Sequence, residues 1–281
     1  MSATIINGKE IAFQIREKLK NEIQTRAITP KLAVILAGHD PASEIYVKNK
    51  QKAAAEVGIE TVLYRFEDDV NPKELEDLID ALNKDFSVNG ILLQLPLPEG
   101  IDSSKILNRI SPQKDVDGFH PFNMGLLMAG MNGGTVAATP KGILRLLKHA
   151  GIELAGKNAL VIGRSNIVGK PMAMLLLNED CTVSVAHSKT KDLKSLCQNA
   201  DIIVSATGCL KLVQKDFIKD GAVLIDVGIC RDENGKLCGD IDFEACLDKA
   251  SFMTPVPGGV GPMTIAMLLE NVLEAYLKQN A

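Results

Sequence analysis

The sequence predicts an α/β protein of two lobes, each built on a parallel sheet, with a cleft between the lobes. Apolar segments of strand length alternate with helical segments along most of the 281 residues. This alternation is typical of parallel sheets covered by helices on both faces. It occurs in two series, separated by a loop-rich region over residues 111–140. A cleft between two such lobes is a usual place for a ligand.

The first series begins with Lys31–Gly38, whose apolar residues predict a buried strand. Pro41–Val57 is expected to be a helix, with Asp40 as its N-cap, Pro41 at its first position and Gly58 as its terminator. The other expected elements are the strands Ile59–Phe66 and Gly90–Leu95 and the helices Pro72–Phe86 and Asp102–Ile110.

The second series follows the domain connection, which we place in residues 111–140 or in the expected helix Pro140–Ala150. Its expected strands are Asn158–Gly163, Cys181–Ala186, Asp201–Ala206, Ala222–Val227 and Ser251–Thr254. Its expected helices are Gly169–Leu177, Leu193–Gln198 and the amphipathic Pro262–Lys278. We expect residues 1–138 and 262–281 to form the first lobe and residues 139–261 the second.

Charge and composition exclude several classes of protein. With 31 Lys and Arg against 35 Asp and Glu, the net charge of −4 argues against a nucleic-acid partner. No apolar segment approaches the length of a membrane span, and Met1–Lys9 lacks the pattern of a secretory signal. None of the six cysteines has CxxC spacing, so we expect free thiols, no metal site and a cytoplasmic protein.

A glycine-containing turn lies where an apolar strand is expected to lead into a helix, at Leu160–Pro171. Gly163 permits a tight turn, and Gly169 permits close packing of the helix on the strand. Ser165 stands near the place of the middle glycine in the usual fingerprint, so the motif is a variant. The strand, turn and helix together predict a Rossmann-type dinucleotide-binding lobe.

The end of the next strand favours NADP over NAD. An NAD site usually has a carboxylate there to bind the ribose hydroxyls. This chain has Ser188 and Lys189 instead, and Arg164 in the glycine-containing turn adds a guanidinium. Hydrogen-bond donors and cations suit a 2′-phosphate. The alternative is that Arg164 and Lys189 are solvated surface residues and that His187 is a half-buried residue at the strand end.

Lys50 is the first candidate for acid–base chemistry. On the expected helix Pro41–Val57, it shares a face with Tyr46 and the apolar residues, whereas Lys48 and Lys52 point the opposite way. Partial desolvation would lower the pKa of Lys50 and suit it for proton transfer. The alternative is that its side chain extends along the surface to a carboxylate.

Polar residues and glycines mark three further places. Gln94 interrupts an apolar strand near its carboxyl end, where α/β proteins bind ligands, although a water-facing edge residue is the alternative. Asp115 and Asp117 precede Gly118, and simple turn formation is the alternative for both. The segment Pro255–Thr264 has three glycines in four positions, which permits close approach of a flat ligand; a rigid linker is the alternative.

Together these segments resemble the bifunctional methylenetetrahydrofolate dehydrogenase/methenyltetrahydrofolate cyclohydrolase family over nearly the whole chain. The residues that carry the resemblance are Ser43-x-x-Tyr46-Val47-x-x-Lys50, Gln94-Leu95-Pro96-Leu97-Pro98, Lys114-Asp115-Val116-Asp117-Gly118-Phe119, Gly163-Arg164-Ser165-x-x-Val168-Gly169-Lys170-Pro171, Asp226-Val227-Gly228-Ile229 and Pro257-Gly258-Gly259-Val260-Gly261-Pro262-Met263-Thr264. The chain departs from the family's usual Pro-Cys-Thr-Pro, because it has Ala137-Ala138-Thr139-Pro140 at that place.

The resemblance implies oxidation of 5,10-methylenetetrahydrofolate with NADP, followed by hydrolysis of the methenyl product to 10-formyltetrahydrofolate. It implies that Lys50 is the general acid and base, that Tyr46 packs on the folate, that Gln94 hydrogen-bonds Lys50 and that Asp117 binds the pterin. The other implied substrate contacts are Leu95, Pro257, Gly258, Gly259 and Val260. The implied NADP contacts are Gly163, Arg164, Ser165, Ser188 and Ile229. The resemblance also implies a homodimer.

Two other functions compete with this interpretation. A shikimate-dehydrogenase-like enzyme would act on a small hydroxy acid and would not need Gln94. A non-enzymatic NADP-binding sensor would bind the cofactor without turnover, with or without Lys50. The shared face of Tyr46 and Lys50 and the segment Pro257–Thr264 favour the folate enzyme.

Overall fold

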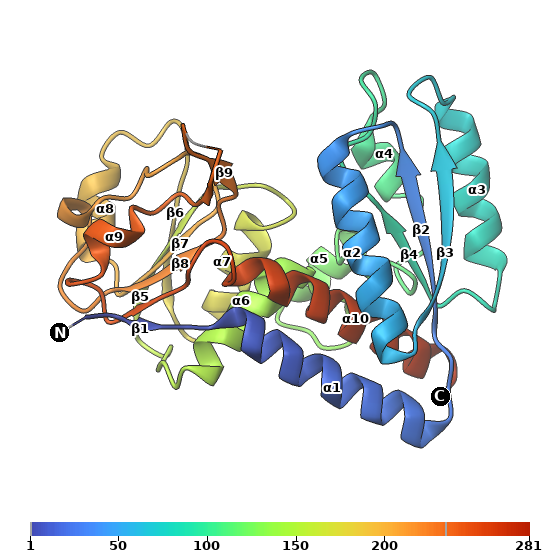
Figure 1. The fold of residues 1–281 in the computed structure, drawn as a ribbon, viewed down its shortest axis with the longest axis horizontal. Helices are drawn as coiled ribbons and strands as arrows, with labels where there is room; N and C mark the ends of the chain where they lie inside the picture. The colour runs from blue at the N-terminus through green and yellow to red at the C-terminus, as the bar shows by residue number, and fades with distance from the viewer. Residues whose placement is uncertain (1, 234) are drawn as a thin grey trace. The chain divides into compact units, whose positions relative to one another are not determined.

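A computed structural model describes residues 2–233 and 235–281, which fold into two compact units (Figure 1). The six-stranded unit contains the residues up to Ala12 and Thr139–Thr264, and the three-stranded unit contains Phe13–Ala138 and Ile265–Ala281. All strand pairs in these two sheets are parallel within the described residues. The predicted α/β class with two parallel sheets is therefore confirmed.

The three-stranded sheet has the order β3 (Glu60–Phe66), β2 (Lys31–Ala37) and β4 (Gly90–Leu93). The central strand β2 is buried on both faces, as its apolar sequence predicts. Ala33, Ile35 and Ala37 share one core cluster with residues of α3 (Pro72–Lys84). The alternate residues of β2 point to the opposite face, and α2 (Pro41–Val57) packs against β2 and β3.

Both ends of α2 follow from the sequence. The Asp40 side chain accepts a hydrogen bond from the Ser43 backbone N at 2.8 Å, which satisfies one of the free N–H groups of the first turn. Gly58 ends the helix in the left-handed conformation at φ 90°. The expected limits of this helix are confirmed, and they set the direction in which its side chains point.

The same unit contains two short helices before the domain connection, α4 (Ser103–Leu107) and α5 (Pro121–Met128). We expected a loop-rich region over residues 111–140, and α5 is a helix within it that we did not predict. The helix begins after His120, whose ring Nδ1 accepts a hydrogen bond from Phe122 N at 3.0 Å. A helix of eight residues with a histidine cap and a central Gly125 lacks the usual sequence signals.

The six-stranded sheet has the order β1-β11-β8-β7-β5-β6. Its strands are β1 (Thr4–Ile5), β5 (Asn158–Ile162), β6 (Thr182–Ala186), β7 (Ile202–Ser205), β8 (Val223–Asp226) and β11 (Phe252–Met253). Its helices are α6 (Ala138–His149), α7 (Gly169–Asn178), α8 (Leu193–Asn199), α9 (Phe243–Cys246) and the 3-10 turn η1 (Lys215–Phe217). A separate antiparallel pair, β9 (Cys230–Arg231) and β10 (Leu237–Cys238), follows β8.

The first residues of the chain do not belong where we expected them. We placed residues 1–138 in one lobe, but β1 pairs with β11 in the six-stranded sheet. Two residues are too few to show the periodicity of a strand. The division between the units then falls within α1 (Gly8–Arg26) and, near the other end of the chain, within α10 (Val260–Gln279). The predicted cleft stays a prediction.

No helix among the described residues combines the length and the apolar character that a membrane span needs.

Candidate functional site

Lys50 lies on the half-buried side of α2 in the three-stranded unit. Its Nζ donates a hydrogen bond to Gln94 Oε1 at 3.0 Å, and it forms no ion pair with the described residues. Burial lowers the pKa of Lys50, and the negative charge of Asp117 opposes that shift. Lys48 and Lys52 are exposed on the same helix. The predicted desolvation of Lys50 is thus found, and the alternative of a surface ion pair is not.

Gln94 is fixed by the backbone around it. It follows the edge strand β4, and its backbone N donates to Ile35 O at 2.9 Å. Its Nε2 donates to Leu95 O at 2.7 Å, which leaves Oε1 facing Lys50. Ser43 Oγ donates to the same carbonyl at 3.3 Å. The side chain therefore does not face water as a plain edge residue would.

Ser43 was missed as a functional candidate by the sequence reasoning. It is buried, and its hydroxyl supports the Leu95 carbonyl that holds the Gln94 amide. The signal was present, because Ser43 lies three residues before Tyr46 and seven before Lys50 on the same helix face. A polar residue at a buried position of an amphipathic helix requires a partner.

Asp115 and Asp117 differ in what they bind. The buried carboxylate of Asp115 accepts hydrogen bonds from three backbone N–H groups, those of residues 118, 119 and 120, at 2.9–3.2 Å, and from Asn123 Nδ2 at 2.8 Å. For Asp115 the turn-forming alternative is therefore correct. The half-buried carboxylate of Asp117 has no hydrogen-bond partner among the residues that the structure describes, so it is available to a ligand.

The environment of Asp117 changes its acidity. Burial, reinforced by the charge of Asp115, raises the pKa of the Asp117 carboxyl to about 6, and Lys50 opposes this shift. A half-buried carboxyl beside a desolvated lysine, both with shifted pKa values, is the kind of pair that functional sites contain. The two groups come from different segments of the same unit.

The raised pKa of Asp117 predicts how its replacement changes stability with pH. The ionised carboxylate destabilises the folded protein above pH 6, and this cost disappears as the pH falls from about 6 towards the usual value of 3.8. We expect Asp117→Asn to raise the melting temperature by at least about 2 °C at pH 8. Scanning calorimetry should show that this gain shrinks towards about pH 4. A gain that does not change with pH would contradict the assignment.

Tyr46 and Leu95 border Lys50 and Gln94. The Tyr46 side chain is 38% exposed, and partial burial raises the pKa of its hydroxyl, so the hydroxyl stays protonated at neutral pH. An aromatic ring that is partly exposed beside buried polar groups can stack on a flat ligand. Leu95 is half-buried and precedes the cis bond to Pro96.

The turn between β5 and α7 in the six-stranded unit needs its two glycines. A Cβ on Gly163, which has φ 118°, would lie 2.5 Å from Ala206 O. A Cβ on Gly169 would lie 2.2 Å from Gly163 O. Ser165 Oγ accepts hydrogen bonds from Val168 N at 3.2 Å and Gly169 N at 3.3 Å, and so closes the turn. The backbone therefore makes the close approach typical of a dinucleotide-binding turn.

The charges near this turn suit a phosphate. Arg164 is exposed and has no ion-pair or hydrogen-bond partner among the described residues. Ser188 is exposed in the turn after β6, where the His187 ring Nδ1 accepts from Lys189 N at 3.1 Å. His187 thus organises the turn. No acidic side chain stands at the end of β6, so these residues fit a dinucleotide that carries a 2′-phosphate.

Ile229 and the segment Pro257–Val260 lie elsewhere in the same unit. Ile229 is 54% exposed and follows Gly228, whose N donates to Asp226 Oδ1 at 2.9 Å. Gly258 O accepts from Lys9 N at 2.9 Å, and a Cβ on Gly8 would lie 1.8 Å from Gly259 O. The segment is therefore packed tightly against the start of α1 and is more than a linker.

The last helix begins two residues earlier than we expected. Val260 is buried and is the first residue of α10, whereas we placed it in the preceding loop. The contacts with folate that we predicted for Val260, Pro257, Gly258 and Gly259 stay predictions.

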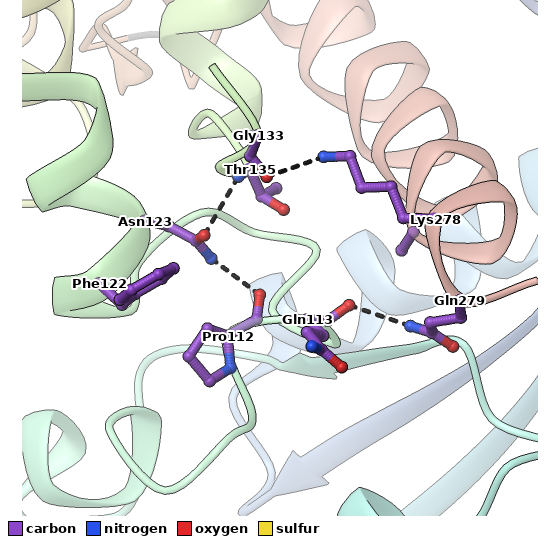
Figure 2. Close-up of a pocket in the computed structure, with 9 residues that line it drawn as sticks. Pro112, Gln113, Phe122, Asn123, Gly133, Thr135, Lys278 and Gln279 are labelled. Atoms are coloured by element: carbon purple, nitrogen blue, oxygen red, sulfur yellow. Dashed lines mark hydrogen bonds between the residues drawn. The ribbon is translucent and has the colours of Figure 1, made fainter. Parts of the chain in front are cut away.

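A separate pocket of about 280 Å³ in the three-stranded unit carries no candidate residue (Figure 2). Figure 2 shows that two of its amide side chains are used within the protein: Asn123 Nδ2 donates to Pro112 O at 3.0 Å, and Gln279 Nε2 donates to Gln113 O at 3.0 Å. Lys278 Nζ donates to Gly133 O at 3.1 Å. These contacts join the C-terminal part of α10 to the loops of the unit, and we assign no function to the pocket.

The fold and these two groups of residues define an α/β protein with a dinucleotide-binding unit and a unit that holds a desolvated lysine. Residues 6–117 match the catalytic domain of tetrahydrofolate dehydrogenase/cyclohydrolase, and residues 137–280 match the NAD(P)-binding domain of the same enzymes. The chain belongs to the tetrahydrofolate dehydrogenase/cyclohydrolase family.

Individual relatives match over nearly the whole chain. The bifunctional protein FolD of Agathobacter rectalis is 52% identical over 97% of this chain and 99% of its own length. The structure of the FolD methylenetetrahydrofolate dehydrogenase/cyclohydrolase of Campylobacter jejuni is similar with a TM-score of 0.96 and 49% identity, and 99% of both chains is covered. The Trypanosoma brucei enzyme, solved with NADP and an inhibitor, is similar with a TM-score of 0.94 and 37% identity over 99% of this chain and 98% of that one.

Proposed function

We propose that this chain oxidises 5,10-methylenetetrahydrofolate with NADP and then hydrolyses the methenyl product to 10-formyltetrahydrofolate. The observation that carries the proposal is the arrangement around Lys50. A half-buried lysine with a lowered pKa is hydrogen-bonded to Gln94 and lies under the influence of Asp117, in the domain that matches the family's catalytic domain. Family membership favours this function over a hydroxy-acid dehydrogenase or a non-enzymatic sensor.

The oxidation depends mainly on alignment of the two reactants. NADP, when bound, supplies the acceptor for the hydride that leaves the methylene carbon. Gly163, Arg164, Ser165, Ser188 and Ile229 would hold it, and the exposed Arg164 and Ser188 suit its 2′-phosphate. The folate product is a cation delocalised over two nitrogens, so its formation needs little acid–base help. Positioning of the two flat rings supplies most of the rate.

The hydrolysis depends on Lys50. As a neutral amine it accepts a proton from the water that attacks the methenyl carbon, and as an ammonium it donates a proton to the departing nitrogen. A lysine with a lowered pKa can serve both needs near neutral pH. Gln94 Oε1 holds Nζ in place. The ring of Tyr46 packs on the folate, and the carboxylate of Asp117 accepts hydrogen bonds from the pterin ring.

One absorbance assay tests the proposed function. Purified protein is mixed with methylenetetrahydrofolate and NADP, and NADPH and the methenyl product are followed together. We expect NADPH to rise steadily while the methenyl product appears only transiently. Absence of NADPH formation would contradict the first activity, and accumulation of the methenyl product to the level of NADPH would contradict the second.

Arg164 should decide the preference for NADP. We expect Arg164→Ala to raise the KM for NADP by about 10–100-fold, because one charge-assisted contact to the 2′-phosphate is lost. The KM for NAD, which lacks that phosphate, should change little. Lys170→Ala is the matched control, since Lys170 is exposed on α7 and already donates to Asn166 at 2.7 Å. Equal effects on both cofactors would show that Arg164 does not contact the phosphate.

Two further expectations go with family membership. We propose a homodimer, for which light scattering should give twice the chain mass of 30.2 kDa; a mass of one chain would contradict it. The cysteines are all free thiols, which is compatible with a reducing compartment, and the cytoplasm stays our prediction for the location.

A further inference from the structure

The hairpin after Ile229 carries two cysteines that face each other. Cys230 lies on β9 and Cys238 on β10, and the antiparallel register pairs them directly. Residues opposite each other in such a ladder place their side chains on the same face of the sheet. Both cysteines are half-buried free thiols, and neither takes part in the proposed function.

The closing turn of the hairpin fixes the type of this pair. Gly235 N donates to Asp232 O at 2.9 Å, and Asp232 N donates to Lys236 O at 3.0 Å. Asp232 and Lys236 are therefore a hydrogen-bonded pair. Hydrogen-bonded and non-hydrogen-bonded pairs alternate along an antiparallel ladder. The pair of Cys230 and Cys238 lies two positions further along the ladder, so it is also of the hydrogen-bonded type. Such a pair has a Cα separation of about 5.5 Å, which lies within the range of about 4.4–6.8 Å found for disulfides.

The usual spacing of side chains in such a pair indicates that a disulfide between Cys230 and Cys238 would be strained. Cβ atoms of directly opposed residues lie about 4.5–5.5 Å apart, and a disulfide needs about 3.5–4.5 Å. A contraction of about 1 Å would allow the bond to form. Strained and accessible disulfides are the easily reduced ones, which serve as redox-responsive sites.

The other cysteines are poorer partners. Cys181, Cys197 and Cys246 are buried in the core of the unit. Cys209 is exposed and lies close enough to influence Cys230 electrostatically, so it is the competitor to exclude. Among the described residues no group of three or more His, Cys, Asp or Glu side chains is arranged to hold a metal ion.

We propose that Cys230 and Cys238 form a redox-active pair, which a small-molecule disulfide such as oxidised glutathione converts to an intramolecular disulfide. One thiolate attacks the small disulfide, forms a mixed disulfide and releases one thiol. The second cysteine of the pair then attacks the mixed disulfide and releases a second thiol, so two protein thiols are oxidised and one disulfide is reduced to two thiols. Burial and nearby acidic groups raise the pKa of the Cys230 thiol. Either cysteine can make the first attack, because the partner that resolves the mixed disulfide lies directly opposite.

The test counts thiols in the full chain. The protein is incubated with excess oxidised glutathione, denatured, alkylated and analysed by mass spectrometry of the intact chain and its peptides. We expect two of the six cysteines to become unavailable to alkylation without gaining glutathione, and the peptides that contain Cys230 and Cys238 to be joined by a disulfide. Excess reduced glutathione should restore all six.

Three variants separate the pair from its competitor. Cys209→Ser should still lose two alkylatable thiols, whereas Cys230→Ser and Cys238→Ser should form no intramolecular disulfide and should stop at a mixed disulfide. A disulfide that contains Cys209, a full set of free thiols after oxidation, or a bond that reduced glutathione fails to break would overturn the proposal. The readout is a mass, so its outcome does not depend on the proposed enzymatic function.

Discussion

Lys50→Met is expected to lower the rate of methenyltetrahydrofolate hydrolysis by at least about 100-fold, since general acid–base catalysis contributes about 100- to 10,000-fold. Methionine keeps about the length of the side chain but cannot carry a proton. Hydride transfer should fall much less, by under about tenfold, because that step needs alignment of the rings more than proton transfer.

The two rates are measured separately for this prediction, one with methenyltetrahydrofolate alone and one with methylenetetrahydrofolate and NADP. Lys48→Met is the matched control, because Lys48 is an exposed lysine of the same helix. It should leave both rates unchanged. Equal and modest losses of both activities in Lys50→Met would remove Lys50 from its proposed role.

Asp117→Asn is expected to raise the KM for the folate substrate in both reactions by about 10–100-fold, with a smaller change in kcat. The carboxylate has no hydrogen-bond partner among the described residues, so its proposed partner is the donor edge of the pterin. A hydrogen bond to a charged group is worth about 1.5–3 kcal/mol, and about 1.4 kcal/mol corresponds to a factor of ten. The amide keeps the shape of the side chain but presents N–H groups to other donors.

The pH dependence of the same KM provides a second measurement. Because the pKa of Asp117 is about 6, the ionised acceptor is lost as the pH falls through that value, and the wild-type KM should rise below it. In Asp117→Asn this rise should be absent. Asp69→Asn, which changes an exposed acid, should behave as the wild type does. If the folate KM of Asp117→Asn still rises below pH 6 as it does in the wild type, a group other than Asp117 causes the rise.

Elements with strong local signals were predicted correctly from the sequence. The limits of α2 follow from Asp40, Pro41 and Gly58, and the half-burial of Lys50 follows from its place on that helix. The need for Gly163 and Gly169 also follows from the strand, turn and helix around them. In each case the physical cause lies within a few residues of the chain, so the pattern alone reveals it.

Features that depend on distant residues could not be predicted. β1 exists because it pairs with β11, some 250 residues further along the chain, and two residues carry no periodicity. Asp115 and Asp117 look alike in sequence. Asp115 has a structural role only because the chain turns back at residues 118–120, so that their backbone N–H groups donate to its carboxylate. The orientation of the Gln94 amide likewise depends on Leu95 O and on its contact with α2.

The most direct test of the central claim follows both products in one solution of the Lys50→Met variant with methylenetetrahydrofolate and NADP. If Lys50 carries the proton in hydrolysis, NADPH and the methenyl product should accumulate in a one-to-one ratio, because oxidation continues and hydrolysis stops. If the methenyl product disappears as fast as it does with the wild-type protein, Lys50 is not the acid–base group and the proposed mechanism is wrong.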